Sequence, residues 1–204
     1  MSYNNYPKTE WNNSNELLKT SKSTNNETLI NEILKFSKNT EIWNNIGASF
    51  EYWETKGFND ITIPSINFKK MEFKGELLLN LKGKVIGINL NKNLIKSFEV
   101  PYFSQILIME LGNLKTKSSY NQLFANAKDY TKEDFVKKVE KFEYNIRNEI
   151  INAFLQGEFN SEKYKNQPCI FEAKKITFEE YYNDERLKNH KKGYEDLWEE
   201  LTTD

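Results

Sequence analysis

The sequence has 204 residues, a formal net charge of −1 from 29 basic and 30 acidic residues, and a low mean hydropathy of −0.78. This length suits one domain with its own hydrophobic core, and the balanced charge gives no support to binding of nucleic acid or of an anionic membrane. A single cysteine and a single histidine exclude an internal disulfide and a conventional zinc-peptidase site.

Residues 1–26 are rich in Asn, Ser, Thr and Lys and hold few apolar side chains. Such a segment cannot bury enough surface to offset its ordering entropy, so we expect a flexible polar tail. It lacks the apolar core of a secretory signal, and no apolar run in the chain approaches the ~20 residues of a membrane span. We therefore expect a cytoplasmic protein, or one exported by a dedicated secretion system without a signal peptide.

Residues 27–204 are expected to form one α+β domain that begins with two helices. Residues 27–38 show the period of an amphipathic helix, and Thr40 is placed to cap a second helix that stops at Gly57. A short strand is expected at residues 61–63.

A β-hairpin is the clearest strand signal in the sequence. Residues 76–81 and 84–90 are strand-like and flank Lys82-Gly83, a dipeptide suited to a tight turn. The sequence therefore predicts a small antiparallel sheet in this part of the chain.

The second half of the domain reads as mostly helical. Pro101 opens a helix over about 102–115 that is apolar almost all round and should be buried. Residues 116–130 are expected to be a polar loop. Thr131 then begins a long helix that ends near Leu155, with Gly157 as its stop.

The C-terminal part is expected to hold two more helices. Residues 158–176 are predicted to be irregular or short-stranded. Thr177 and Glu180 form a capping-box pattern for a helix near 178–187, and Asn189 is placed to cap the last helix. Together these elements predict an α+β fold that is mostly helical.

Glu110 is the most informative single residue. On a helical wheel it lies among apolar side chains, namely Phe103, Ile106, Leu107 and Leu114. A buried carboxylate must be protonated, paired or hydrogen-bonded, because burial without a partner is costly. Asn113 lies on the same side of the helix, so both side chains could reach one polar pocket. Hydrogen bonds from both to loop backbone would explain the pattern equally well.

Glu143 lies inside the apolar stripe of the long helix. A second inward carboxylate suggests that the two helices share a polar centre. An ion pair with Arg147, four residues later, is the simpler alternative. Glu140 lies at the edge of the stripe, and we expect it to be solvated near Lys137 or Lys141.

His190 is the single histidine and is expected close to a helix N-terminus, where the helix dipole favours its neutral form. Neutral imidazole can accept a proton or bind a metal, whereas a surface loop position is the simpler alternative. Tyr194 should face the same way. Motifs such as HExxH, CxxC and the P-loop are absent, so any metal would be a harder divalent ion held by oxygen ligands.

The stretch from Ile106 to Asn113, ILIMELGN, resembles the ELxN-bearing helix of metallopeptidase-like domains in bacterial polymorphic toxins and secreted effectors. In these zincin-like domains the HExxH helix is altered. Met109 and Asn113 stand here in the places of the two histidines, while Glu110 keeps the place of the catalytic glutamate. The resemblance therefore does not imply a zinc site.

Later segments extend this resemblance over about residues 70–200. Phe142 to Tyr144 with Arg147 resembles the second motif of these domains, and the segments 180–182, 190–194 and Trp198 resemble the closing one. The resemblance implies a sheet hairpin packed on the Glu110 helix, and action on a protein or peptide. The candidate site residues are Glu110, Asn113, Glu143, Tyr144, His190 and Tyr194.

Two classes of function fit these residues. In the first, the chain is a hydrolase or group-transfer enzyme of an effector or toxin, with Glu110 as general acid or base and the other candidates orienting substrate or completing a ligand or proton-transfer set. In the second, it is a non-catalytic module, such as an immunity protein or pseudoenzyme, that binds a cognate protein. The second class requires Glu110 and Glu143 only to hold the core together.

Overall fold

The computed structural model of the chain describes residues 24–45, 65–79, 85–164 and 167–203. Its elements in chain order are α2 (Thr24–Lys38), β1 (Ser65–Lys69), β2 (Gly75–Leu79), β3 (Val85–Asn91), η3 (Lys92–Lys96), α4 (Val100–Lys115), α5 (Lys117–Ala125), η4 (Ala127–Asp129), α6 (Lys132–Leu155), α7 (Phe178–Tyr182), η5 (Glu185–Leu187) and α8 (Lys188–Thr202). This is the mostly helical α+β fold that the sequence predicts.

The sheet has three strands in the order β1-β3-β2. Strands β2 and β3 pair antiparallel, which confirms the hairpin, while β1 pairs with β3 in parallel. The sheet is therefore mixed and not purely antiparallel. Asn91 fixes the return from β1 to β2, because its Nδ2 donates to the carbonyls of Met71 and Phe73 at 2.8 and 2.7 Å. The turn predicted at residues 82–83 and the strand predicted at 61–63 lie outside the described residues.

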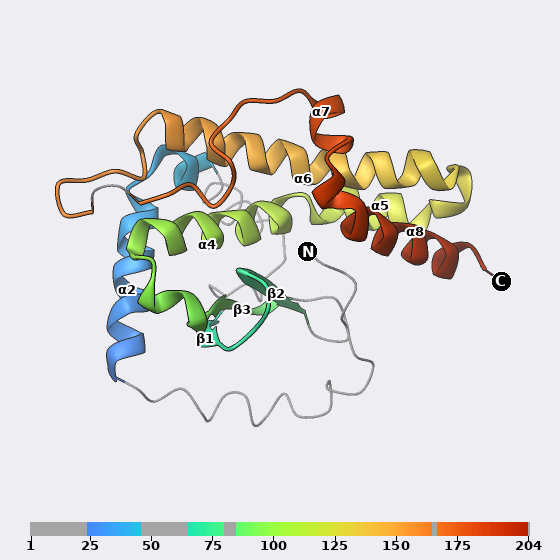
Figure 1. The fold of residues 1–204 in the computed structure, drawn as a ribbon. Helices are drawn as coiled ribbons and strands as arrows, with labels where there is room; N and C mark the ends of the chain where they lie inside the picture. Colours follow the sequence, from blue (N-terminus) through green and yellow to red (C-terminus); the bar gives the residue numbers. More distant parts are fainter. Residues whose placement is uncertain (1–23, 46–64, 80–84, 165–166, 204) are drawn as a thin grey trace.

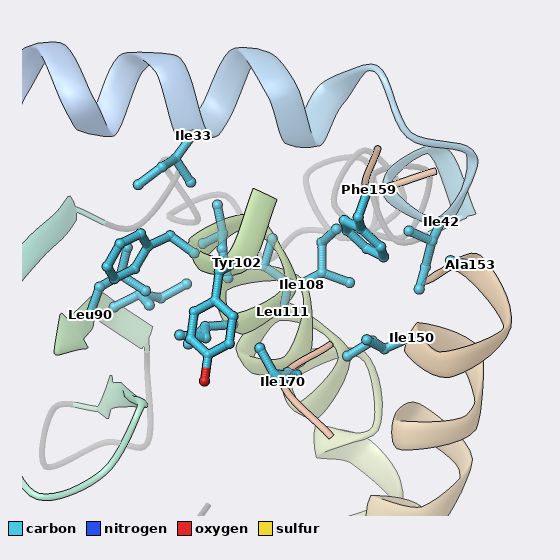
Figure 2. Close-up of a cluster of buried hydrophobic side chains, with 14 of the residues drawn as sticks. Ile33, Ile42, Leu90, Tyr102, Ile108, Leu111, Ile150, Ala153, Phe159 and Ile170 are labelled. Carbon is cyan, nitrogen blue, oxygen red and sulfur yellow. The ribbon is translucent and has the colours of Figure 1, made fainter. Parts of the chain in front are cut away.

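Helix α4 is the centre of the fold. It is buried on almost every side, as its composition predicts, because it packs against the sheet, α2 and α6 (Figure 1). The largest core cluster surrounds it, and Figure 2 labels ten of its members, namely Ile33, Ile42, Leu90, Tyr102, Ile108, Leu111, Ile150, Ala153, Phe159 and Ile170. A helix packed on most of its sides can hold a functional side chain in one position.

Residues 116–130, predicted to be a polar loop, instead form α5 and the short η4 turn. The prediction was wrong because three apolar side chains at helical spacing decide this segment. Tyr120, Leu123 and Ala127 are all buried and belong to a second core cluster that includes residues of α6 and Tyr194 of α8. Their burial outweighs the many polar residues between them.

The start and end of α6 are where the sequence predicts them. Thr131 accepts a hydrogen bond from the backbone N–H of Asp134 at 3.1 Å, and Gly157 takes the positive φ of 85° that suits a helix stop. At the start of the chain, α2 begins at Thr24, inside the segment predicted to be a tail. Residues 1–23 and the predicted stop at Gly57 lie outside the described residues, although Thr40 does cap a helical turn at 41–45.

The C-terminal helices differ from the prediction in two places. The capping box of Thr177 and Glu180 is present, but the helix that it starts ends at Tyr182 and a separate short turn follows. Helix α8 begins at Lys188, so Asn189 lies within its first turn and is not its cap. None of the helices in the described ranges has the length and apolar character that crossing a membrane requires.

Gly112 lets α4 lie close to α6. A Cβ at this position would lie 2.7 Å from Cγ2 of Ile146. We expect Gly112→Ala to lower the free energy of unfolding by up to about 2 kcal/mol, because overpacking outweighs the gain in helix propensity. Urea unfolding measures this change. In an Ile146→Ala background the same substitution should be neutral or stabilising, and a stabilising effect in the wild type would contradict the close contact.

Candidate functional site

A cavity of about 650 Å³ opens beside Glu110, within the size range of ligand pockets. It lies between the start of β2, α4, α6, the segment 170–176 and the start of α8. Its lining is mixed, with the polar residues Glu72, Lys74, Glu110, Glu143, Arg147, Glu172, Tyr181, Asp184, Arg186 and His190, and the apolar or small residues Phe73, Gly75, Ile106, Met109, Ile170, Phe171, Ile176 and Leu187.

Glu110 is buried as predicted, with 6% of its surface exposed. Burial raises the pKa of its carboxyl group from 4.5 to about 7, and the negative charges of Glu143 and Glu76 add to this rise. Its Oε2 atom has no hydrogen-bond partner among the described residues. A carboxyl group in this state can exchange a proton close to neutral pH.

Gly75, the first residue of β2, allows the strand to pass directly over Glu110. A Cβ at Gly75 would lie 2.6 Å from Cγ2 of Ile106 and 3.2 Å from Oε1 of Glu110. Any larger residue would push the strand away from α4 or fill the space beside the carboxyl group. The close approach of β2 therefore sets one wall of the cavity.

Asn113 is also buried, with 1% of its surface exposed, but it does not line the cavity. Both of its side-chain polar atoms lack a hydrogen-bond partner within the described ranges. Neither oxygen nor nitrogen of this amide reaches loop backbone, so the simpler alternative from the sequence does not explain Asn113. Its amide nevertheless lies close to Glu110, where it opposes the rise in the pKa of that carboxyl group, so the two side chains are neighbours although only Glu110 lines the cavity.

Glu143 is buried and lines the same cavity as Glu110, as predicted. Its Oε1 accepts hydrogen bonds from the hydroxyls of Tyr120 at 3.2 Å and Tyr194 at 3.4 Å. These contacts with two tyrosines mean that pairing with Arg147 is not the whole explanation for its burial. Tyr194 does not line the cavity itself, but its hydroxyl contacts a carboxylate that does.

Glu140 is the residue whose environment differs most from its prediction. We expected it to be solvated, but it is fully buried. Its Oε1 lies 2.8 Å from Nδ1 of His190, and its Oε2 accepts a hydrogen bond from the hydroxyl of Tyr181 at 3.1 Å. A carboxylate that holds one imidazole nitrogen fixes the orientation and the tautomer of the ring, as in many acid–base sites.

His190 lies between Glu140 and the cavity, with 26% of its side chain exposed. Burial lowers the pKa of the imidazole, but the hydrogen bond and the negative charge of Glu140 outweigh this and raise the pKa above 6.5. The carboxylate of Glu140 therefore acts against the preference for the neutral form that the helix dipole alone predicts. The ring of Tyr194 stands edge-on to the imidazole at 4.9 Å.

Tyr144 lies away from the cavity. Its hydroxyl donates to the carbonyl of Ile176 at 2.7 Å, and its ring packs on Phe178 and Tyr181. This places Tyr144 as a support for the segment that leads into α7. Helical spacing could have found Glu140 and Arg147, because they lie three residues before and four after Glu143 on the same helix.

A metal ion would need several donor side chains in one place. Among the described residues, no group of three or more His, Cys, Asp or Glu side chains could hold such an ion. The divalent metal that the sequence leaves open therefore has no ligand cluster within those ranges. Comparison with protein-family models, curated proteins and solved structures finds no match to this chain.

The Glu140–His190 contact gives a direct test, because the chain has one histidine and so one imidazole signal. We expect NMR titration to give His190 a pKa above 6.5. Glu140→Gln should lower this pKa, because the hydrogen bond and charge of Glu140 are lost and only the charge of Glu143 still opposes the effect of burial. Lys137→Gln, on the exposed face of α6, is the control and should leave the titration unchanged. An unchanged His190 pKa in Glu140→Gln would show that the contact is absent in solution.

Proposed function

We propose that this chain is a bacterial effector- or toxin-type domain whose degenerate metallopeptidase-like site hydrolyses, or transfers a group on, a peptide or protein. One observation carries the proposal. A buried carboxyl group with a pKa of about 7, Glu110, shares a cavity with His190, whose ring is oriented by Glu140. Such a pair supplies a proton acceptor and a proton donor at neutral pH.

The two groups fit the needs of amide hydrolysis. Ionised Glu110 takes a proton from a water molecule as the water oxygen bonds to the carbonyl carbon. The protonated His190 stabilises the charge that develops on the carbonyl oxygen and gives its proton to the departing nitrogen as the C–N bond breaks. Glu110 then returns its proton to the imidazole, directly or through water, and both groups regain their starting states.

The surrounding residues hold these two groups in place. Nδ1 of His190 is occupied by its contact with Glu140, so Nε2 is the ring nitrogen that acts on substrate. Glu143, fixed by Tyr120 and Tyr194, contributes the negative charge that helps to raise the pKa of Glu110. These are positioning roles, because none of them requires contact with the reacting atoms.

The passage of β2 over α4 supports the zincin-like part of the proposal. The resemblance implies a hairpin packed on the helix that carries the catalytic glutamate, and Gly75 of β2 lies against Glu110 of α4. Met109, in the place of the first motif histidine, lines the cavity, whereas Asn113 does not. The ELxN motif therefore contributes Glu110 to the site but does not contribute the histidine ligands of a zinc site.

A non-catalytic partner-binding module, such as an immunity protein or pseudoenzyme, is the second candidate. The observation in its favour is that Glu140 and Glu143 both accept hydrogen bonds from tyrosines of neighbouring helices. Carboxylates used in this way can tie a core together without any chemistry. A cognate protein that co-purifies with the chain, together with no turnover, would favour this candidate.

The test of the proposal uses the purified protein and a peptide library prepared from a bacterial proteome. Mass spectrometry would detect new peptide ends after incubation with the wild type and with Glu110→Gln. In parallel, both forms would be expressed in a bacterial cytoplasm and growth would be followed. New ends or growth arrest with the wild type alone would support the proposal, and identical results with both forms would reject it.

A further inference from the structure

Arginine is scarce in this chain, and its placement is informative. The sequence has two arginines among 29 basic residues, and both of them, Arg147 and Arg186, line the cavity beside Glu110. A chain that uses lysine almost everywhere else therefore has a guanidinium group at two positions around one site. The guanidinium differs from an ammonium group in its planar fork of donors, which matches the two oxygens of an oxyanion.

Arg186 is already neutralised. It lies at the rim with 72% of its side chain exposed, and it forms ion pairs with Asp184 and Glu172. The donors of its guanidinium are directed to those two carboxylates. Arg186 is therefore part of the wall and does not need a further anion.

Arg147, unlike Arg186, forms no direct ion pair with a described carboxylate. It is buried, with 7% of its surface exposed, and no salt bridge joins it to a carboxylate among the described residues. Its hydrogen bonds are long, at 3.4 Å to Oδ1 of Asn148 and 3.5 Å to the carbonyl of Glu172. Carboxyl groups such as Asp184 are near enough to feel its charge, but no described carboxylate contacts the guanidinium directly, so its donors are left for a ligand oxyanion.

Two aromatic rings hold the guanidinium in position. Its carbon lies 5.6 Å from the ring centre of Phe171 and 5.7 Å from that of Tyr181. Contacts of this kind orient the fork while leaving its edge for hydrogen bonding. Ile106, Met109 and Ile170 add apolar surface to the cavity wall. The arrangement suits an oxyanion attached to an apolar body.

The charge of the ligand follows from the rest of the lining. Carboxyl groups of Glu72, Glu143 and Glu172 face the same cavity, along with Glu110 and Asp184. A doubly charged phosphate would be repelled more strongly than a singly charged carboxylate. We infer that Arg147 docks a carboxylate group of the ligand, either a peptide C-terminus or an acidic side chain with an apolar neighbour. The identification of this ligand as the substrate rests on the proposed function. The binding of a carboxylate at Arg147 does not depend on it.

The test measures binding alone, with small probes and the full-length chain. N-acetylphenylalanine carries a carboxylate on an apolar body, and N-acetylphenylalaninamide is its uncharged match. We expect calorimetry or NMR titration to show at least about tenfold weaker binding of the amide, because a charge-assisted pair is lost. Arg147→Lys should also weaken binding of the acid at least about tenfold, since it keeps the charge but loses the fork.

Arg186→Lys is the matched control, and it should bind the acid within about twofold of the wild type because that charge is already neutralised. The two arginine Nε–H signals of the wild-type protein give a readout that does not depend on folding of a variant. The Arg147 signal should shift with the acid and not with the amide.

Equal binding of acid and amide, or a shift of the Arg186 signal alone, would overturn the inference. Binding of phenyl phosphate at least as tight as that of the acid would overturn the carboxylate assignment. Binding that depends on Arg147 in a protein without peptide turnover would reject the proposed function and leave this site intact. Peptide turnover in a protein that shows no binding dependent on Arg147 would support the proposed function and reject the carboxylate site.

Discussion

Glu110→Gln is expected to lower turnover of any peptide substrate by about 100-fold or more, the usual contribution of a general base. The substitution keeps the shape of the side chain but removes its ability to accept a proton. The loss should appear in the rate constant kcat rather than in KM, because the amide still fills the same space. The measurement is the rate at which new peptide ends form, with growth arrest in a bacterial cytoplasm as the cellular readout.

The pH dependence makes this expectation more specific. Because the pKa of Glu110 is about 7, wild-type kcat/KM should fall as the pH drops below about 7 and the base becomes protonated. Any residual activity of Glu110→Gln should lack this acidic limb.

Glu72→Gln is the matched control. It removes a carboxylate that also lines the cavity but lies in the exposed connection between β1 and β2. Full activity of Glu110→Gln, or an equal loss in Glu72→Gln, would contradict a role for Glu110 as the base.

Local sequence patterns were sufficient to predict many of the helices and strands that position this site. The cap at Thr131, the stop at Gly157 and the β2–β3 hairpin depend on interactions between near neighbours in sequence. The inward direction of Glu110 and Glu143 follows from helical periodicity, which fixes the face of a helix without reference to its partners. These features were predicted correctly because the information for them is local.

The parts that were missed depend on contacts between distant segments. The apolar residues of α5 are at helical spacing, but what stabilises the helix is packing of Tyr120 and Leu123 against a core cluster shared with α6 and α8. Glu140 is buried because His190, fifty residues later, and Tyr181 cover it. Periodicity can place a residue near the edge of a helical stripe, but only the position of the next helix decides whether that edge is exposed.

The stability of the protein should fall with rising pH in a way that depends on Glu110. Its pKa is about 7 in the folded chain against an ordinary value of 4.5, so the folded state keeps a proton that the unfolded state has lost. The contribution of Glu110 is therefore complete below pH 4.5 and is lost as the pH rises to about 7. The full loss corresponds to about 3 kcal/mol, because each pKa unit is worth about 1.4 kcal/mol.

Glu110→Gln should remove this pH dependence, because the amide is neutral at every pH. Urea unfolding at pH 5 and pH 8 should show that the variant gains about 2 to 3 kcal/mol relative to the wild type over this interval, with an unchanged denaturant slope. Greater stability with lower activity would mean that the fold carries a destabilising carboxyl group for the sake of chemistry. A variant that is less stable at both pH values would instead assign Glu110 to the core and favour the partner-binding module.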